Sequence, residues 1–258
     1  MDTSIEGLRV VVTAGGSGIG RVIAESFARA GARVHVCDIE RRTLDELGAA
    51  EPAIGATLAD VAEPREVDRL FDEALERLDG LDALINNAGI SGPTAAVEDL
   101  APSDWDRTMA VNVSGQFYCV RRAVPPMKRA GGGSIVNISS TSARTGLPFR
   151  VAYAVSKVAV LGLTHTLARE LGPSGIRVNA ILPGFVNNER ARRVVREKAA
   201  ALGQTPEAYE RQLLEFISMR TMVEPEEIAH MAMFLCSPAG RHVSGQSIGV
   251  CGNMEHER

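Results

Sequence analysis

Short apolar runs alternate with longer amphipathic stretches along almost the whole of this 258-residue chain. This alternation is typical of βαβ units, in which a helix follows each buried strand and packs on the sheet. The predicted strands are Leu8–Thr13, Arg33–Asp38, Ile54–Leu58, Ala83–Asn86, Gly133–Ile138, Arg177–Ile181 and Gln246–Val250. Seven parallel strands with helices on both faces make one doubly wound α/β domain, in which ligands bind at the carboxyl ends of the strands.

The amphipathic stretches predict the helices. They are Ile19–Ala30, a helix beginning with Arg41–Leu47, Arg65–Leu78, Asp104–Ala130, Ala152–Leu171 and Glu226–Cys236. We expect Asp104–Ala130 to break or kink near Pro125 and Pro126, because proline lacks the N–H that an interior helical position needs. Two further helices, Glu189–Ala201 and Pro206–Ser218, are expected to form a small lid within residues 187–223.

Composition narrows the classes of function. A chain that is 45% hydrophobic can bury a large core, and we expect a single domain over residues 1–258. The net charge of −4 and pI near 5.8 argue against a nucleic-acid partner, because no basic excess exists to neutralise phosphates. The chain starts without the features of a secretory signal, and no apolar run approaches the roughly 20 residues that cross a bilayer. We therefore expect a soluble, cytoplasmic protein with no membrane partner.

The cysteines and histidines are too dispersed to predict a metal site. Cys37, Cys119, Cys236 and Cys251 include no C-x-x-C pair, and the five histidines show no H-x-x-x-H spacing. We expect reduced thiols and no bound metal.

The glycine-rich segment Thr13–Gly20 joins the first predicted strand to the first helix. Glycines there let the backbone approach a pyrophosphate, whose charge would face the free N–H groups of the helix N-terminus. The candidate cofactor residues of this turn are Gly15, Ser17, Gly18, Ile19 and Gly20. The segment predicts a dinucleotide site.

Asp38 ends the second predicted strand, 18 residues after Gly20. A carboxylate there can accept hydrogen bonds from the adenosine ribose hydroxyls and would repel a 2′-phosphate, so NAD is favoured over NADP. Ile39, the next residue, joins Asp38 as a candidate cofactor residue. Arg41 and Arg42 are close enough to favour NADP instead, but we interpret them as solvated residues of the next helix.

Together with several later motifs, these residues resemble the short-chain dehydrogenase/reductase family, from Leu8 to about Asn253. The motifs are Thr13–Gly20, Asp60-Val61, Asn86-Asn87-Ala88-Gly89, Asn112, Ser140, Tyr153-Ala154-Val155-Ser156-Lys157 and Pro183-Gly184. The resemblance implies a Rossmann fold, a nicotinamide cofactor, oxidoreductase activity on a small molecule and, commonly, a homotetramer.

The resemblance also implies a role for each matching residue. Asn112 would hold a water molecule in a proton relay, and Ser140 would orient the substrate oxygen. Asp60 would hold the adenine amino group, Asn86 and Ala88 would bracket the adenosine ribose and support the sheet edge, and Pro183 and Gly184 would line the nicotinamide. The other cofactor-binding residues that the resemblance implies are Val61, Asn87, Gly89 and Val186.

Tyr153 and Lys157 allow the chemistry to be argued from the residues. They are four residues apart on a predicted helix, so both side chains project from one face. A tyrosine hydroxyl ionises near pH 10, and a neighbouring ammonium with a positive nicotinamide would favour the phenolate. Tyr153 is therefore the expected acid/base, Lys157 assists it, and both also count as cofactor contacts.

The chain departs from the family pattern at three places. Ala14 stands where glycine is usual, and we expect it to keep a negative φ while the neighbouring glycines take the strain. Asn188 replaces a frequent threonine that contacts the nicotinamide carboxamide, and asparagine can also donate and accept hydrogen bonds. Cys251-Gly252-Asn253 replaces the more usual Asp-Gly-Gly, a change that we expect to alter assembly rather than catalysis.

Ser142 and Arg150 are the candidate substrate residues. Arg150 precedes Tyr153 by three residues, and a guanidinium there would bind a carboxylate, sulfonate or phosphate through two hydrogen bonds. Our hypothesis is a small polar substrate such as a hydroxy acid, sugar or sugar acid. The alternatives are an NADPH-dependent 3-oxoacyl thioester reductase, which Asp38 disfavours, and a non-catalytic NAD-binding scaffold or sensor.

Overall fold

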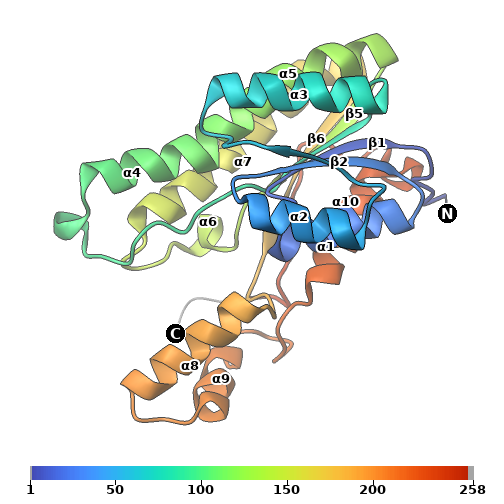
Figure 1. The fold of residues 1–258 in the computed structure, drawn as a ribbon. Helices are drawn as coiled ribbons and strands as arrows, with labels where there is room; N and C mark the ends of the chain where they lie inside the picture. Colours follow the sequence, from blue (N-terminus) through green and yellow to red (C-terminus); the bar gives the residue numbers. More distant parts are fainter. Residues whose placement is uncertain (1, 255–258) are drawn as a thin grey trace.

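The computed structural model describes residues 2–254, apart from the side chains at positions 190, 194, 197, 198 and 201. Seven parallel strands form one sheet in the order β3-β2-β1-β4-β5-β6-β7, which confirms the predicted class (Figure 1). The strands are β1 (Arg9–Thr13), β2 (Arg33–Asp38), β3 (Gly55–Leu58), β4 (Ala83–Asn86), β5 (Gly133–Ile138), β6 (Ile176–Pro183) and β7 (Ser247–Val250). The chain adds β2 and β3 on one side of β1 and then returns to add β4 on the other side.

Helices cover both faces of the sheet, so the arrangement is doubly wound (Figure 1). One face carries α1 (Gly18–Arg29), α2 (Arg41–Ala50) and α10 (Pro225–Cys236). The other carries α3 (Pro64–Leu78), α5 (Gly115–Ala130) and α7 (Val151–Leu171). The short helices α4 (Pro102–Met109) and α6 (Ser142–Thr145) precede α5 and α7 along the chain.

The valines of the central strand β1 form an unbroken apolar run in the sequence, and their packing explains why. Val10 and Val12 enter the core beneath α1, where they join Phe27, while Val11 enters the opposite core with Phe71 of α3. Successive side chains of a strand point to opposite faces, and here both faces are covered. The strand must therefore be apolar at every position.

The predicted helix Asp104–Ala130 is interrupted in a different place from the one we expected. A π-helical turn, Ala110–Ser114, separates α4 from α5, whereas α5 continues through Pro125 and Pro126 to Ala130. Gly131 then ends α5 with a left-handed backbone, at φ 85°. The π turn holds Asn112, and π turns within helices are frequent at functional sites.

The lid projects from the carboxyl edge of the sheet (Figure 1). It contains α8 (Glu189–Ala201) and α9 (Pro206–Leu214), which ends four residues before the predicted Ser218. The lid leaves and rejoins the body at a narrow neck, where Val186 and Val223 form a parallel bridge. The lid has a small core of its own, which includes the buried side chains of Val195, Ala199 and Ile217.

One segment within the described residues, Val151–Ser174, is long and apolar enough to cross a membrane by length and composition. The expectation that no apolar run approaches that length was therefore wrong. The segment is α7 with the turn after it, and α7 packs on β5 and β6 with Lys157, Val160 and Thr164 buried. Only part of its surface is covered, as in a helix that lays one face on a sheet.

Candidate active site

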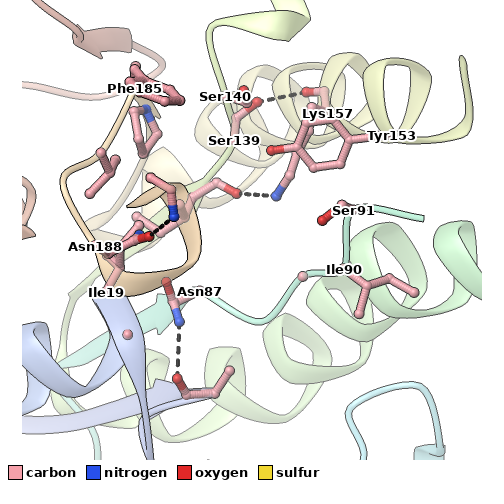
Figure 2. A pocket seen from close by; sticks show the side chains of 18 of the residues that line it. Ile19, Asn87, Ile90, Ser91, Ser139, Ser140, Tyr153, Lys157, Phe185 and Asn188 are labelled. Atoms are coloured by element: carbon pink, nitrogen blue, oxygen red, sulfur yellow. Dashed lines mark hydrogen bonds between the residues drawn. The ribbon is translucent and has the colours of Figure 1, made fainter. Parts of the chain in front are cut away.

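A cavity of about 650 Å³ opens at the carboxyl ends of β1, β4, β5 and β6 (Figure 2). Its wall is contributed by residues that follow these strands, by one face of α7 and by the first turn of α8. The lining residues are Ala14, Ser17, Gly18, Ile19, Asn87, Gly89, Ile90, Ser91, Ile138, Ser139, Ser140, Arg150, Tyr153, Lys157, Pro183, Gly184, Phe185, Val186, Asn188, Glu189 and Ala191. The cavity therefore unites most of the motifs that the sequence singled out.

The glycine-rich turn presents the N-terminus of α1 to this cavity through Ser17, Gly18 and Ile19. Gly15 is one of the positions where glycine is needed, because a Cβ there would lie 2.6 Å from Val36 Cγ1. The backbone at the start of α1 is thus both close-packed and open to a ligand. This is the geometry that a pyrophosphate requires.

Ala14 contradicts our expectation of a negative φ. Its φ is +49°, a left-handed conformation that costs energy for a residue with a Cβ, and Gly15 beside it is not left-handed. Asn87 explains how the strained turn is held, because its Nδ2 donates to the carbonyls of Thr13, at 3.1 Å, and Ala14, at 3.2 Å. Asn87 thereby joins the loops that follow β1 and β4.

Asp38 is buried at the end of β2, where the glycine turn fixes its carboxylate. Oδ2 accepts a hydrogen bond of 3.1 Å from Gly16 N, and Oδ1 accepts one of 3.2 Å from Glu40 N. Arg41 and Arg42 are exposed, and Arg42 pairs with Glu46 one helical turn later at 2.6 Å. Both arginines therefore occupy the solvated positions that we expected.

Ile39 is exposed directly after β2, beside Asp38, and does not line the cavity. Farther along the same edge, the Asp60 carboxylate accepts a 2.7 Å hydrogen bond from Arg107 Nη2 and another, of 2.9 Å, from Ala62 N. Val61 is buried against Gly115 of α5. Asp60 is thus held in a fixed orientation next to the end of β3.

Asn86, the last residue of β4, and the three residues after it either support the sheet edge or line the cavity. The Asn86 side chain points into the core, where its Nδ2 donates to Asn137 Oδ1 at 2.9 Å, so it supports the sheet and does not reach the cavity. Ala88 N donates to Thr13 Oγ1 at 2.9 Å. Asn87 and Gly89 line the cavity, whereas Asn86 and Ala88 support the sheet edge beneath it.

Asn112 is buried in the π turn and ties two walls of the site together. Its Oδ1 accepts from Ile90 N at 2.8 Å, and its Nδ2 donates to Ile90 O and to Ser156 Oγ, both at 2.9 Å. A Cβ built on Gly89 would lie 3.2 Å from Lys157 Nζ and 3.3 Å from Asn112 Oδ1, so both groups border the same small space. Asn112 is therefore positioned next to Lys157 without lining the open cavity.

Three serines follow β5 and play different parts. Ser139 Oγ donates to the carbonyl of Lys157 at 2.8 Å and so fixes α7 against the loop. Ser140 lines the cavity, and its Oγ accepts a 3.2 Å hydrogen bond from Ser142 N. Ser142 itself is buried behind that wall, so the structure does not place it in the cavity as a substrate contact.

Tyr153 and Lys157 project from the same face of α7 into the cavity (Figure 2). Lys157 Nζ lies 5.7 Å from the centroid of the Tyr153 ring and donates to the Ile138 carbonyl at 3.0 Å. The lysine is only 4% exposed, and this burial lowers its pKa from 10.5 to about 8. A buried ammonium beside a phenol is the arrangement that acid/base chemistry on an alcohol needs.

Arg150 also lines the cavity, beside Tyr153. Its guanidinium carbon lies 5.5 Å from the ring centroid of Tyr153, while Nη2 donates to Ser91 O at 2.9 Å and Nη1 to Thr94 Oγ1 at 3.2 Å. The side chain thus fastens the loop after β4 to the start of α7. The sequence predicted its place near Tyr153 but not these partners.

The cavity is also lined by Pro183, the last residue of β6, and by Gly184 and Val186 after it. Asn188 follows them, and its Oδ1 accepts from Ala191 N at 2.9 Å, which caps the first turn of α8. Its amide oxygen therefore serves the lid helix. This use explains how asparagine is accommodated where the family often has threonine.

Several lining residues were missed by the sequence-based prediction. They are Ile90, Ile138, Ser139 and Phe185. Each is the last residue of a strand or lies within four residues of a strand's end, so the rule that ligands bind at strand carboxyl ends could have found them. Glu189 and Ala191 lie within the predicted lid.

Comparison with known proteins agrees with the geometry. A family model described as enoyl-(acyl carrier protein) reductase matches residues 13–254. The chain belongs to the short-chain dehydrogenase/reductase family. D-beta-hydroxybutyrate dehydrogenase of Rhizobium meliloti is 32% identical over 94% of this chain and 96% of its own length. The 3-oxoacyl-[acyl-carrier-protein] reductase of Thermotoga maritima is also 32% identical, over 97% and 98%.

A solved structure of 7 alpha-hydroxysteroid dehydrogenase, complexed with NADH and 7-oxo glycochenodeoxycholic acid, has the same fold. It superposes with a TM-score of 0.89 at 33% identity, covering 99% of this chain and 97% of the other. This chain is accordingly an oxidoreductase of the family, acting on hydroxyl or keto groups with a nicotinamide cofactor.

Replacing Lys157 with methionine should stabilise the protein near neutral pH while abolishing turnover. Because the pKa of Lys157 falls from 10.5 to about 8 on folding, the unfolded chain binds more protons between those values, and the stability of the unmodified protein rises with pH across that window. Methionine removes the cost of the buried charge but also the hydrogen bond to Ile138. We expect a gain in unfolding free energy of about 1–3 kcal/mol at pH 7.

Urea unfolding of both proteins at pH 7 and again near pH 10 measures this difference. The gap should narrow at the higher pH, since the lysine of the unmodified chain is then largely neutral in the folded state. A variant that is less stable at pH 7, or a gap that does not depend on pH, would contradict the assignment of a costly buried ammonium.

Proposed function

We propose that this chain is an NAD-dependent oxidoreductase that interconverts a small secondary alcohol and its ketone, with Tyr153 as acid/base. The observation that carries the proposal is that Tyr153 and the buried Lys157 share one cavity with the glycine turn. Bound NAD would supply the acceptor for the alcohol's hydride.

The residues of the chain then have distinct tasks in oxidation. Ser140, oriented by Ser142 N, would hold the substrate oxygen, and Tyr153 would take its proton as the phenolate. Lys157 would stabilise that phenolate by its charge. Asn112, which borders the small space beside Lys157 Nζ, would hold a water molecule there, through which the proton reaches solvent. Reduction reverses these steps.

The residues around the glycine turn fit a dinucleotide. Ser17, Gly18 and Ile19 expose the start of α1 to the cavity, where backbone N–H groups can meet a pyrophosphate. Asp38 lies behind the turn with a carboxylate fixed by Gly16 N, a position that suits ribose hydroxyls and disfavours a 2′-phosphate. These features support NAD over NADP.

Arg150 supports a substrate that carries an anionic group, such as a small hydroxy acid or sugar acid. It is the guanidinium that lines the cavity beside Tyr153, and its contacts with Ser91 and Thr94 hold it there. The similarity to D-beta-hydroxybutyrate dehydrogenase, whose name specifies a hydroxy acid, agrees with this choice.

Two other functions can be distinguished from the proposed one by cofactor preference and by turnover of an alcohol. An NADPH-dependent 3-oxoacyl thioester reductase is supported by the similarity to the Thermotoga maritima enzyme, but Asp38 argues against its cofactor. A non-catalytic NAD-binding scaffold would bind NADH yet turn over no alcohol. The intact set of Asn112, Ser140, Tyr153 and Lys157 favours an enzyme.

Tyr153→Phe should lose turnover by about 10²- to 10⁴-fold, the usual contribution of a general acid/base, while its affinity for NADH stays within about threefold. Steady-state rates with a panel of hydroxy acids, sugars and hydroxyacyl thioesters provide the first measurement, and fluorescence titration with NADH and NADPH provides the second. Tyr118→Phe, on α5 and outside the cavity lining, is the matched control. Full activity of Tyr153→Phe, or tighter binding of NADPH than of NADH, would overturn the corresponding part of the proposal.

Arg150→Met should raise the KM of a hydroxy acid by about tenfold or more, because a charge-assisted pair is lost. The KM of an uncharged polyol should change far less. Thr94→Ala serves as the control, since it removes one partner of Arg150 but leaves the positive charge. Equal increases for charged and uncharged substrates, matched by Thr94→Ala, would show that Arg150 only fastens the loop.

We also propose a homotetramer assembled through α5 and α7. Large apolar side chains are uncovered on these helices: Phe117 is 49% exposed, Val155 40% and Val158 50%. Val158→Asp combined with Phe117→Asp should reduce the assembly to smaller species in sedimentation velocity. Val97→Asp, exposed before α4, is the control, and an unchanged sedimentation coefficient in the double variant would refute these helices as the interface.

A cytoplasmic location is part of the proposal. The four cysteines are free thiols, three of them buried, which suits a reducing compartment. Recovery of the protein in a secreted or membrane fraction would contradict it.

A further inference from the structure

The end of the described chain is fastened to the returning arm of the lid. Ser218 N donates to Asn253 O at 3.0 Å, Met219 N donates to Gly252 O at 3.1 Å, and Ile217 forms an antiparallel bridge with Met254. We call this pairing of Gly252–Met254 with Ile217–Met219 the clasp. It lies beyond α9, on the arm that returns from the lid to the body.

The same tail segment also touches the walls of the cavity. Gly184 N donates to Val250 O at 3.0 Å, and a Cβ on Gly184 would lie 2.7 Å from Cys251 Cβ. Thr141, between Ser140 and Ser142, donates through Oγ1 to Met254 Sδ at 3.7 Å. The clasp thus connects the lid to the two segments that carry Gly184 and Ser140.

Asn253 is suited to the clasp by both its backbone and its side chain. Its φ is +57°, and asparagine is among the residues with a Cβ that best tolerate this conformation. Its Nδ2 donates to Ser218 Oγ at 2.7 Å, which adds a side-chain bond to the two backbone bonds. A glycine at this position would keep the backbone and lose that bond.

The lid has a second attachment at its neck. Asn187 N donates to Val223 O at 2.8 Å, and Val223 N donates to Phe185 O at 2.9 Å. The neck lies at the base, whereas the clasp holds the arm that returns from α9. Since Asn188 and Glu189 line the cavity, a lid that swings about its neck changes the cavity wall. Such a swing requires the clasp to loosen.

We propose that the clasp is a latch that fixes the lid over the substrate, with Asn253 and Ser218 as positioning residues for the alcohol or ketone. This inference rests on the proposed function only in taking the cavity of Tyr153 as the place where substrate reacts. The glycine turn and Asp38, which would hold the pyrophosphate and the adenosine of NAD, lie on other elements. The tail meets the proposed cofactor site only at Gly184, so the latch should act mainly on the substrate and much less on NAD.

Asn253→Gly, Ser218→Ala and the double variant test the latch by two measurements. Amide hydrogen exchange of residues 206–219, made on the full chain without ligands, should become faster in each variant. The KM of the alcohol should rise about fivefold, the effect of one side-chain hydrogen bond, while the KM of NAD changes by less than twofold. The double variant should be no worse than either single one, because both remove the same bond.

Gly252→Ala should have a larger effect on the KM of the alcohol. An added Cβ would lie 2.9 Å from Ile217 Cγ2, and Gly252 is left-handed at φ +61°. Gly203→Ala is the matched control: it has nearly the same φ, +64°, but open space around the added methyl group. Equal changes in the two variants would mean that backbone strain, and not the clasp, accounts for the effect.

Unchanged exchange in Asn253→Gly would overturn the latch, whether or not any alcohol is turned over. Faster exchange with an unchanged KM of the alcohol, or an equal rise in the KM of NAD, would overturn it as well. Failure of the proposed function is a separate result, since it appears as absent turnover in the unmodified chain.

Discussion

After β3 the chain returns across the sheet, so that β4 lies beside β1 on the side away from β2. This reversal of strand order is the constraint on which the rest of the structure depends. The chain builds β2 and β3 on one side of β1 and then returns to place β4 on the other. Loops that leave the carboxyl ends of β1 and β4 must therefore diverge, and a crevice opens between them. Asn87 bridges that crevice at its base by donating to Thr13 and Ala14, so the opening has a fixed width.

A series of hydrogen bonds between buried polar side chains links β4 and β5 to α7. Asn86 donates to Asn137, whose own amide donates to Thr164 on α7. Asn112 and Ser139 add further bonds to α7, through Ser156 Oγ and the Lys157 carbonyl. Buried polar groups are costly unless they are paired, so these bonds permit few orientations of the helix. The helix that carries Tyr153 and Lys157 is consequently held at several points.

Strain also collects around the cavity and its lid. Among the described residues, the non-glycine positions with positive φ are Ala14, Asp79, Phe149, Arg220 and Asn253. Ala14 lines the cavity, Phe149 precedes Arg150, Asn253 is part of the clasp, and Arg220 directly follows it. Such conformations persist only where the surroundings determine them, and they cluster at sites that act on ligands. The buried ammonium of Lys157 is a further cost located at the same place.

The sequence by itself determined the parts of this protein that depend on short-range pattern. The period of apolar residues identified the strands and helices, and the spacing of Tyr153 and Lys157 placed them on one face of a helix, since that spacing is a property of the helix itself. Tertiary structure decided the rest. It held the left-handed Ala14 through hydrogen bonds from Asn87, the residue after β4, turned Asn86 into the core, and gave Arg150 its partners on a loop more than fifty residues away. It also fastened the tail to the lid. These features depend on contacts between segments that are distant in the sequence, and local periodicity carries no information about such contacts.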